Sequence, residues 1–144
     1  MKIFFVAGEK SGDEAGALLA EEILRSKPDR QLVGFGGEKM QTAGVHILEN
    51  STSWSQIGLW ENFKMLPKTL PGFYRAQKKI QEEKPDALVL IDFPFFNLKL
   101  ARWAKKHSIP VFYYISPVVW GLNKNRAKWR RKTRVAPANH PRYR

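Results

Sequence analysis

The chain begins with an apolar segment that runs directly into a turn containing two glycines, and then into an amphipathic segment. The apolar segment is residues 2–7 (KIFFVA), and the turn is residues 8–13 (GEKSGD). This order predicts a buried strand over 2–7, a tight turn, and a helix over 12–26 with apolar side chains at helical spacing. Open α/β sheets bind ligands at the carboxyl ends of their strands, so the turn marks a place for chemistry.

Strand-like and helix-like segments alternate along the chain up to residue 115. Short apolar runs predict strands at 31–35, 45–48, 87–91 and 110–115. Further helices are predicted in a short stretch that runs through Met40, over 72–83 and over 97–106. The run at 87–91 (ALVLI) is unbroken, as is typical of a strand buried on both faces of a parallel sheet. The alternation predicts an α/β fold, a Rossmann-like parallel sheet with flanking helices.

Composition excludes several kinds of site. The chain has no cysteine, which excludes disulfides, zinc–thiolate sites and cysteine nucleophiles. The three histidines, His46, His107 and His140, are not spaced as metal ligands. We therefore expect no metal site. No other cofactor is expected either. No apolar run approaches the roughly 20 residues of a membrane-spanning helix, and the N-terminus lacks a secretory signal, so the predicted location is the cytoplasm.

Basic residues are concentrated in the second part of the chain. Residues 1–92 hold 13 acidic and 12 basic side chains, whereas residues 93–144 hold 13 basic side chains and no acidic one. Residues 123–144 also lack apolar periodicity, which predicts a Rossmann-like domain over 1–122 and a basic, disordered tail over 123–144. Basic segments suit anionic partners, but this one has no nucleic-acid-binding motif, so a nucleic-acid partner is not expected.

Two glycine-containing segments fall short of nucleotide-binding motifs. The phosphate-loop pattern needs glycine at the positions of Glu9 and Phe4, and residues 34–37 (GFGG) are followed by Lys39 where a dinucleotide fingerprint has its third glycine. What remains at residues 8–13 is a turn in which Ser11 and Asp13 can cap the following helix, while Gly8 and Gly12 allow a ligand close to the backbone. The alternative is a purely structural strand-to-helix turn.

Polar side chains follow the predicted strands at the same edge of the sheet. Asp92 follows the most apolar strand, where a partly desolvated carboxylate can accept a proton, hold a sugar hydroxyl or simply cap the next helix. Asn97 either shares this cleft or begins that helix. Ser116 and Trp120 follow the strand at 110–115, and Trp120 either stacks on a ligand or packs in the core.

Residues 54–74 are rich in aromatic side chains with lysines at their border. Such a segment either lies in a membrane interface and contacts acyl chains, or forms a helix that covers the sheet. The side chains predicted to form the membrane or acyl-chain surface are Trp54, Leu59, Trp60, Phe63, Leu66 and Leu70.

Five segments resemble, in this order, the lipid-A-disaccharide synthase family of GT-B glycosyltransferases. They are 7–13 (AGEKSGD), 34–44 (GFGGEKMQTAG), 57–61 (IGLWE), 91–97 (IDFPFFN) and 114–121 (YISPVVWG), and the resemblance runs from about residue 3 to about residue 128. It implies the N-terminal half of a GT-B fold. It also implies an inverting transfer of 2,3-diacylglucosamine from UDP to 2,3-diacylglucosamine 1-phosphate, with no obligatory metal. The products are UDP and the β-1,6-linked lipid A disaccharide precursor.

The resemblance also implies roles for particular residues. Asp92 is the candidate base that takes the acceptor's hydroxyl proton, although Phe95 stands where some members carry a second aspartate. The candidate substrate contacts are Gly8, Glu9, Ser11, Gly12, Asn97, Ser116 and Trp120.

The implied partners are the UDP-linked donor, the acceptor, the cytoplasmic face of the inner membrane and a separate C-terminal half of the GT-B fold. That half is expected because the chain would end before a UDP-binding domain, and the change in character after Lys128 suggests a shifted reading frame or an artificial end. The alternative is an inactive fragment that acts only as a lipid- or membrane-binding module.

Overall fold

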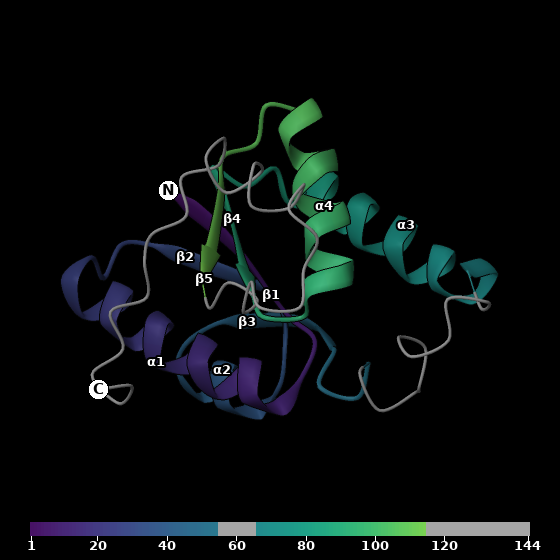
Figure 1. The fold of residues 1–144 in the computed structure, drawn as a ribbon. Coiled ribbons are helices and arrows are strands. Elements are labelled where there is room, and N and C mark those ends of the chain that lie inside the picture. Colours follow the sequence, from purple (N-terminus) through teal and green to yellow (C-terminus); the bar gives the residue numbers. More distant parts are fainter. Residues whose placement is uncertain (55–65, 115–144) are drawn as a thin grey trace, which may run out of the picture.

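The computed structural model describes residues 1–54 and 66–114, in which a parallel sheet lies between two layers of helices (Figure 1). Its strands are ordered β3-β2-β1-β4-β5 and every neighbouring pair is parallel. This arrangement confirms the predicted Rossmann-like sheet with flanking helices. The strands are β1 (Lys2–Ala7), β2 (Gln31–Gly36), β3 (His46–Asn50), β4 (Ala87–Ile91) and β5 (Val111–Tyr114). The helices are α1 (Lys10–Ser26), α2 (Glu38–Thr42), α3 (Leu66–Glu83) and α4 (Pro94–Lys106).

The two faces of the sheet carry separate apolar clusters. Along β1, Phe4 and Val6 face α3 and α4, whereas Phe5 and Ala7 face α1 and α2. Every residue of β4 is buried, because this strand lies inside the sheet and helices cover both of its faces. Figure 1 shows the two helical layers, with α1 and α2 below the sheet and α3 and α4 on its other side.

Helix boundaries differ from the sequence-based expectation at three N-termini. Helix α1 begins at Lys10 instead of residue 12, and α4 begins at Pro94 instead of Asn97. Helix α3 begins at Leu66 instead of residue 72, so the prolines at positions 67 and 71 lie within it. Proline in the first turn of a helix is tolerated, because the N–H it lacks would have no partner there. Pro67 occupies such a position, whereas Pro71 is the sixth residue of α3 and lies beyond the first turn.

None of the helices in residues 1–54 and 66–114 combines the length and the apolar character that a bilayer-crossing helix requires. The predicted basic tail over 123–144 and its boundary with the domain lie outside the described residues.

Candidate functional site

The strand order reverses between β1 and β4, which are neighbours in the sheet. From β1 the chain builds outward through β2 to β3, then crosses back to place β4 and β5 on the other side of β1. In open α/β sheets, ligands bind in the crevice beyond the carboxyl ends of the strands at this reversal. Ala7 at the end of β1 is in register with Ile91 at the end of β4. Glu9 and Asp92 follow these two strand ends, so the fold brings two predicted site residues to one place.

Asp92 and Glu9 each place a carboxyl group at the strand reversal. Burial raises the pKa of Asp92, and a hydrogen bond from the Phe93 backbone N–H only partly opposes that rise. Burial is also the larger cause of the raised pKa of Glu9, and the negative charge of Asp92 adds to it. A carboxylate with a raised pKa binds a proton more readily near neutral pH, which is the property a general base needs.

The backbone after β4 adopts a conformation that side chains other than glycine rarely take. Asp92 has φ 49° and Phe93 has φ 50° and ψ 59°, so two successive residues are left-handed. Each costs on the order of 1–3 kcal/mol, and such residues cluster at functional sites where surrounding contacts hold them. Two side chains donate hydrogen bonds to the Asp92 carbonyl oxygen. The Tyr113 hydroxyl does so at 2.6 Å and the Asn97 Nδ2 at 2.8 Å.

Asn97 is fully buried in the first turns of α4. Its Nδ2 also donates to the Ile91 carbonyl oxygen at 3.2 Å. Because both neighbours are carbonyl acceptors, the amide NH₂ must face them. The Oδ1 atom then faces away, and it is the one buried side-chain oxygen or nitrogen of the described residues without a hydrogen-bond partner. Asn97 therefore neither begins α4 nor lies open to solvent, and its observed contacts support the turn that carries Asp92.

Gly8 and Gly12 are both buried, and each accommodates a close neighbour. A Cβ atom at position 8 would lie 2.4 Å from the Phe93 ring. One at position 12 would lie 3.3 Å from the Ala7 Cβ and 3.7 Å from the Ile91 Cγ2. The glycines therefore allow Phe93 and α1 to pack at this edge, and their contact with a ligand stays a prediction. Ser11 lies exposed in the first turn of α1, beside this edge.

The predicted helix cap by Asp13 was assigned to the wrong helix. No side chain caps α1, whose N-cap residue is Glu9. Asp13 is buried, and its carboxylate accepts backbone N–H groups at the start of α2. Its Oδ1 lies 2.7 Å from the nitrogen of Gly37 and 3.1 Å from that of Met40, and its Oδ2 lies 3.1 Å from that of Lys39. Three donors and the helix dipole favour a carboxylate at α2. The bonds span 24 to 27 residues, so local sequence cannot reveal them.

Trp54 is the only member of the predicted acyl-chain surface whose side chain the structure describes. It is partly buried and packs on Phe35, Phe93 and Phe96, with ring centroids 5.5, 6.4 and 5.4 Å away. These contacts are those of a core aromatic next to the candidate site. Leu59, Trp60, Phe63, Ser116 and Trp120 lie outside the described residues, as do the side chains of residues 66–71 and 95. Their proposed roles stay predictions.

Two residues at the edge of the sheet were missed by sequence reasoning. The Tyr113 hydroxyl is buried beside Asp92, and burial together with the Asp92 charge raises the pKa of this phenol. It therefore stays protonated and remains a hydrogen-bond donor. Ser51 is fully buried, and its hydroxyl donates to the Ala7 carbonyl oxygen, which ties the end of β3 to the end of β1. A tyrosine in a buried strand usually needs a polar partner, which was the available signal for Tyr113.

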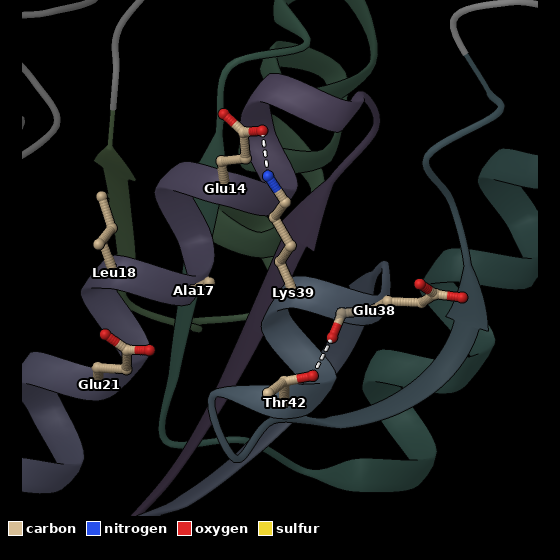
Figure 2. Close-up of a pocket in the computed structure, with 7 residues that line it drawn as sticks. All are labelled: Glu14, Ala17, Leu18, Glu21, Glu38, Lys39 and Thr42. Carbon is tan, nitrogen blue, oxygen red and sulfur yellow. Dashed lines mark hydrogen bonds and ion pairs between the residues drawn. The ribbon is translucent and has the colours of Figure 1, made fainter.

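A shallow groove between α1 and α2 contains none of the predicted site residues. Figure 2 shows its seven lining residues, among them the exposed Leu18 and an ion pair between Glu14 and Lys39. The Thr42 hydroxyl donates to the Glu38 carbonyl oxygen within α2. The only pairing between charged side chains that Figure 2 draws in this groove is that of Glu14 with Lys39, and nothing about the groove indicates a ligand. Within residues 1–54 and 66–114, no cluster of histidine and acidic side chains could hold a metal ion.

The family model described as lipid-A-disaccharide synthetase matches residues 3–134. The chain belongs to this family. The match confirms the resemblance recognised from the five sequence segments, and it reaches beyond residue 128, where the resemblance was expected to end.

Curated relatives show the same membership. The lipid-A-disaccharide synthase of Syntrophus aciditrophicus is 44% identical over 126 residues, which cover 88% of this chain and 33% of the relative. That of Geobacter sulfurreducens is 41% identical over 127 residues, again 88% of this chain and 33% of the relative. The chain thus spans about a third of the length of these relatives.

Among solved structures, the calicheamicin glycosyltransferase CalG4 superposes on 97% of this chain and 37% of its own length, with a TM-score of 0.55 and 12% identity. At this identity the likeness concerns the fold alone. It agrees with the expected half of a GT-B fold.

Proposed function

We propose that this chain forms the acceptor-binding side of the active site of a lipid-A-disaccharide synthase. In the proposed reaction, the 6-hydroxyl of 2,3-diacylglucosamine 1-phosphate attacks C1 of the UDP-linked 2,3-diacylglucosamine. The new C1–O bond forms as the bond from C1 to UDP breaks, and the configuration at C1 inverts. UDP leaves with the bonding electrons, and the hydroxyl proton passes to a base. Membership of the family, together with two carboxyl groups at the strand reversal, supports this proposal.

Asp92 is the proposed base. It follows β4 at the strand reversal, and burial raises the pKa of its carboxyl group, which favours proton uptake from a hydroxyl. Hydrogen bonds from Asn97 and Tyr113 to its backbone carbonyl oxygen hold the turn that carries it, which restricts where the carboxyl group can lie before substrate binds. Fixed placement of a reacting group is one of the main sources of enzymatic rate enhancement.

Glu9 is the proposed acceptor of hydrogen bonds from the sugar hydroxyls. It follows β1, is partly buried, and is close enough to Asp92 for that charge to raise its pKa. Ser11, exposed in the first turn of α1, can add a hydroxyl on the same side. Ser116 and Trp120 follow β5, the neighbour of β4, and are proposed as further substrate contacts on this side of the active site.

The UDP-linked donor, the diacylated acceptor and the cytoplasmic face of the inner membrane are the proposed partners. This part of the proposal comes from the family's chemistry, since both sugars carry acyl chains. It is tested by flotation of the full chain with vesicles of neutral or anionic lipid. Recovery of the chain with vesicles supports a membrane location, and its absence from every vesicle fraction contradicts it.

The activity is tested with a chimera in which this chain replaces the matching third of the Syntrophus aciditrophicus relative. Purified chimera is incubated with UDP-2,3-diacylglucosamine and 2,3-diacylglucosamine 1-phosphate, and disaccharide and UDP are measured. The unaltered relative is the positive control, and its remaining two thirds alone is the negative control. The same assay is run on this chain alone and on this chain mixed with the remaining two thirds of the relative.

Turnover by the chimera supports the proposed function. A folded, soluble chimera that forms no disaccharide contradicts it. The Asp92→Ala chimera tests the base separately. Loss of turnover by about a hundredfold or more is expected for a general base, and full activity would remove Asp92 from that role.

A further inference from the structure

We infer that Tyr113 is a positioning residue, which holds the Asp92 carboxyl group at the reaction site by binding the backbone of the same residue. The inference rests on the proposed role of Asp92 as the base. Tyr113 was not singled out by the sequence, and it lies on β5, a different strand from the one that carries Asp92.

The first observation is the shape of the turn. Asp92 and Phe93 are both left-handed, with φ 49° and 50°. A chain of L-residues leaves this conformation unless other contacts hold it. The Asp92 backbone nitrogen donates to the Tyr114 carbonyl oxygen at 3.3 Å, a long bond at the end of the sheet that provides limited restraint.

The second observation is the pair of donors on the Asp92 carbonyl oxygen. The Tyr113 hydroxyl lies 2.6 Å away and the Asn97 Nδ2 lies 2.8 Å away. They reach the same oxygen from β5 and from α4, so the turn is held from two separate elements. Tyr113 is 3% exposed and Asn97 is fully buried, so water cannot readily replace either donor.

The third observation concerns ionisation. Burial and the nearby Asp92 charge both raise the pKa of Tyr113, so its hydroxyl stays a donor across the pH range in which enzymes work. The Asp92 carboxyl group owes its raised pKa chiefly to burial. If the turn relaxes, this carboxyl group moves toward water and its pKa falls. Tyr113 would thereby influence both the place and the proton affinity of the base without contacting substrate.

The test compares Tyr113→Phe with Tyr114→Phe. Both changes remove one hydroxyl and keep the ring, and the Tyr114 ring packs on the opposite face of the sheet. Carboxyl carbon NMR on the full chain follows the titration of Asp92, and backbone carbon shifts of Asp92 and Phe93 report φ. In Tyr113→Phe we expect a lower Asp92 pKa and shifts that move away from left-handed values. In Tyr114→Phe we expect neither.

Kinetics of the same variants in the active chimera supply a second readout. Tyr113→Phe is expected to lower kcat about tenfold and change KM less than twofold, because a misplaced base slows chemistry more than binding. The acid limb of its pH profile should move to lower pH together with the Asp92 pKa. A general loss of folding would not move this limb.

Asn97→Leu provides a second variant, because it removes the other donor to the Asp92 carbonyl oxygen, keeps a side chain branched at the same position and introduces no charge beside Asp92. It should move the backbone shifts of Asp92 and Phe93 in the same direction as Tyr113→Phe. If backbone shifts and Asp92 pKa in Tyr113→Phe equal those of Tyr114→Phe, the inference is overturned. If the NMR changes occur but Asp92→Ala retains full turnover, the proposed catalytic role fails and the structural link between Tyr113 and Asp92 stands.

Discussion

The carboxylate of Asp13 in α1 accepts the backbone N–H of Gly37 at 2.7 Å and so caps α2, a helix that begins 25 residues later in the chain. The same carboxylate also binds the nitrogens of Lys39 and Met40. A Cβ atom at position 37 would lie 2.7 Å from the Asp13 Oδ2, so glycine is needed there for the carboxylate to approach. Two segments of the family motif thus act as one structural unit that joins α1 to α2.

Replacing Asp13 by alanine is expected to destabilise the protein strongly. The change leaves three backbone N–H groups, two of them buried, without their acceptor, and we expect a loss of about 3 kcal/mol in the free energy of unfolding. Urea unfolding followed by circular dichroism measures it. Asp13→Asn should also destabilise, because its amide NH₂ would face a backbone donor.

Ser11→Ala is the matched control for Asp13. Ser11 lies exposed two residues earlier in the same helix, so its replacement should change stability by less than about 0.5 kcal/mol. Equal stability of the Asp13→Ala and Ser11→Ala proteins would show that the Asp13 cap contributes nothing.

Gly8→Ala is expected to disturb the candidate site through Phe93. The added methyl group would lie 2.4 Å from the Phe93 ring, which must move, and Phe93 is itself part of the left-handed turn. We expect a loss of about 1–3 kcal/mol in the free energy of unfolding, as for other overpacked positions.

Gly72→Ala is the control for Gly8→Ala. Gly72 lies within α3, and a Cβ atom there would meet nothing within 4 Å. The same substitution should therefore stabilise the protein by about 1 kcal/mol, since alanine favours a helix more than glycine does. In one urea unfolding series, we expect the free energy of unfolding to fall in Gly8→Ala and to rise in Gly72→Ala. Equal changes in the two variants would refute the proposed clash at position 8.

The sheet and most of its helices could be predicted because their signals are local. An unbroken apolar run such as residues 87–91 indicates a buried parallel strand whatever lies around it. The placement of Asp92 and Glu9 at one edge of the sheet could also be predicted, because the carboxyl ends of parallel strands share one edge. The order of the strands then brings these two residues together at the reversal.

The remaining features depend on contacts between distant segments. The bond from Tyr113 to Asp92 joins residues 21 apart. Neither it nor the left-handed conformation of Phe93 leaves a local pattern. The assignment of Asp13 to its own helix failed for the same reason, since a side chain in a first turn can also reach a neighbouring helix. Local sequence thus indicates which residues reach the site, and tertiary contacts decide what each one does.

Replacing Asp92 by asparagine is expected to stabilise the protein at neutral pH. Burial raises the pKa of Asp92 above its ordinary value of 3.8, so between the two pKa values the folded state binds more protons than the unfolded state. Stability therefore falls as pH rises through this window, and the full cost of the buried charge is present above the folded pKa. Asparagine has no charge to bury.

The advantage of Asp92→Asn over the unaltered protein should therefore be largest at pH 7 and disappear below pH 3.8. Urea unfolding at a series of pH values measures it. Asp29→Asn is the control, since the Asp29 side chain is 71% exposed and its charge stays in water. An Asp92→Asn protein that is less stable than the unaltered protein at pH 7 would contradict this account of burial.

Asp92→Asn should also lower the pKa of Glu9. The pKa of Glu9 is raised first by its own burial and second by the charge of Asp92. Asparagine removes the second cause and leaves the first, so the pKa should fall and still remain above the ordinary value of 4.5. Carboxyl carbon NMR on the full chain resolves the titration, with Asp29→Asn as the control for loss of a distant charge. An unchanged Glu9 pKa would mean that the two carboxyl groups do not share one site, and the proposed pairing of a base with a sugar-binding carboxylate would then have to be abandoned.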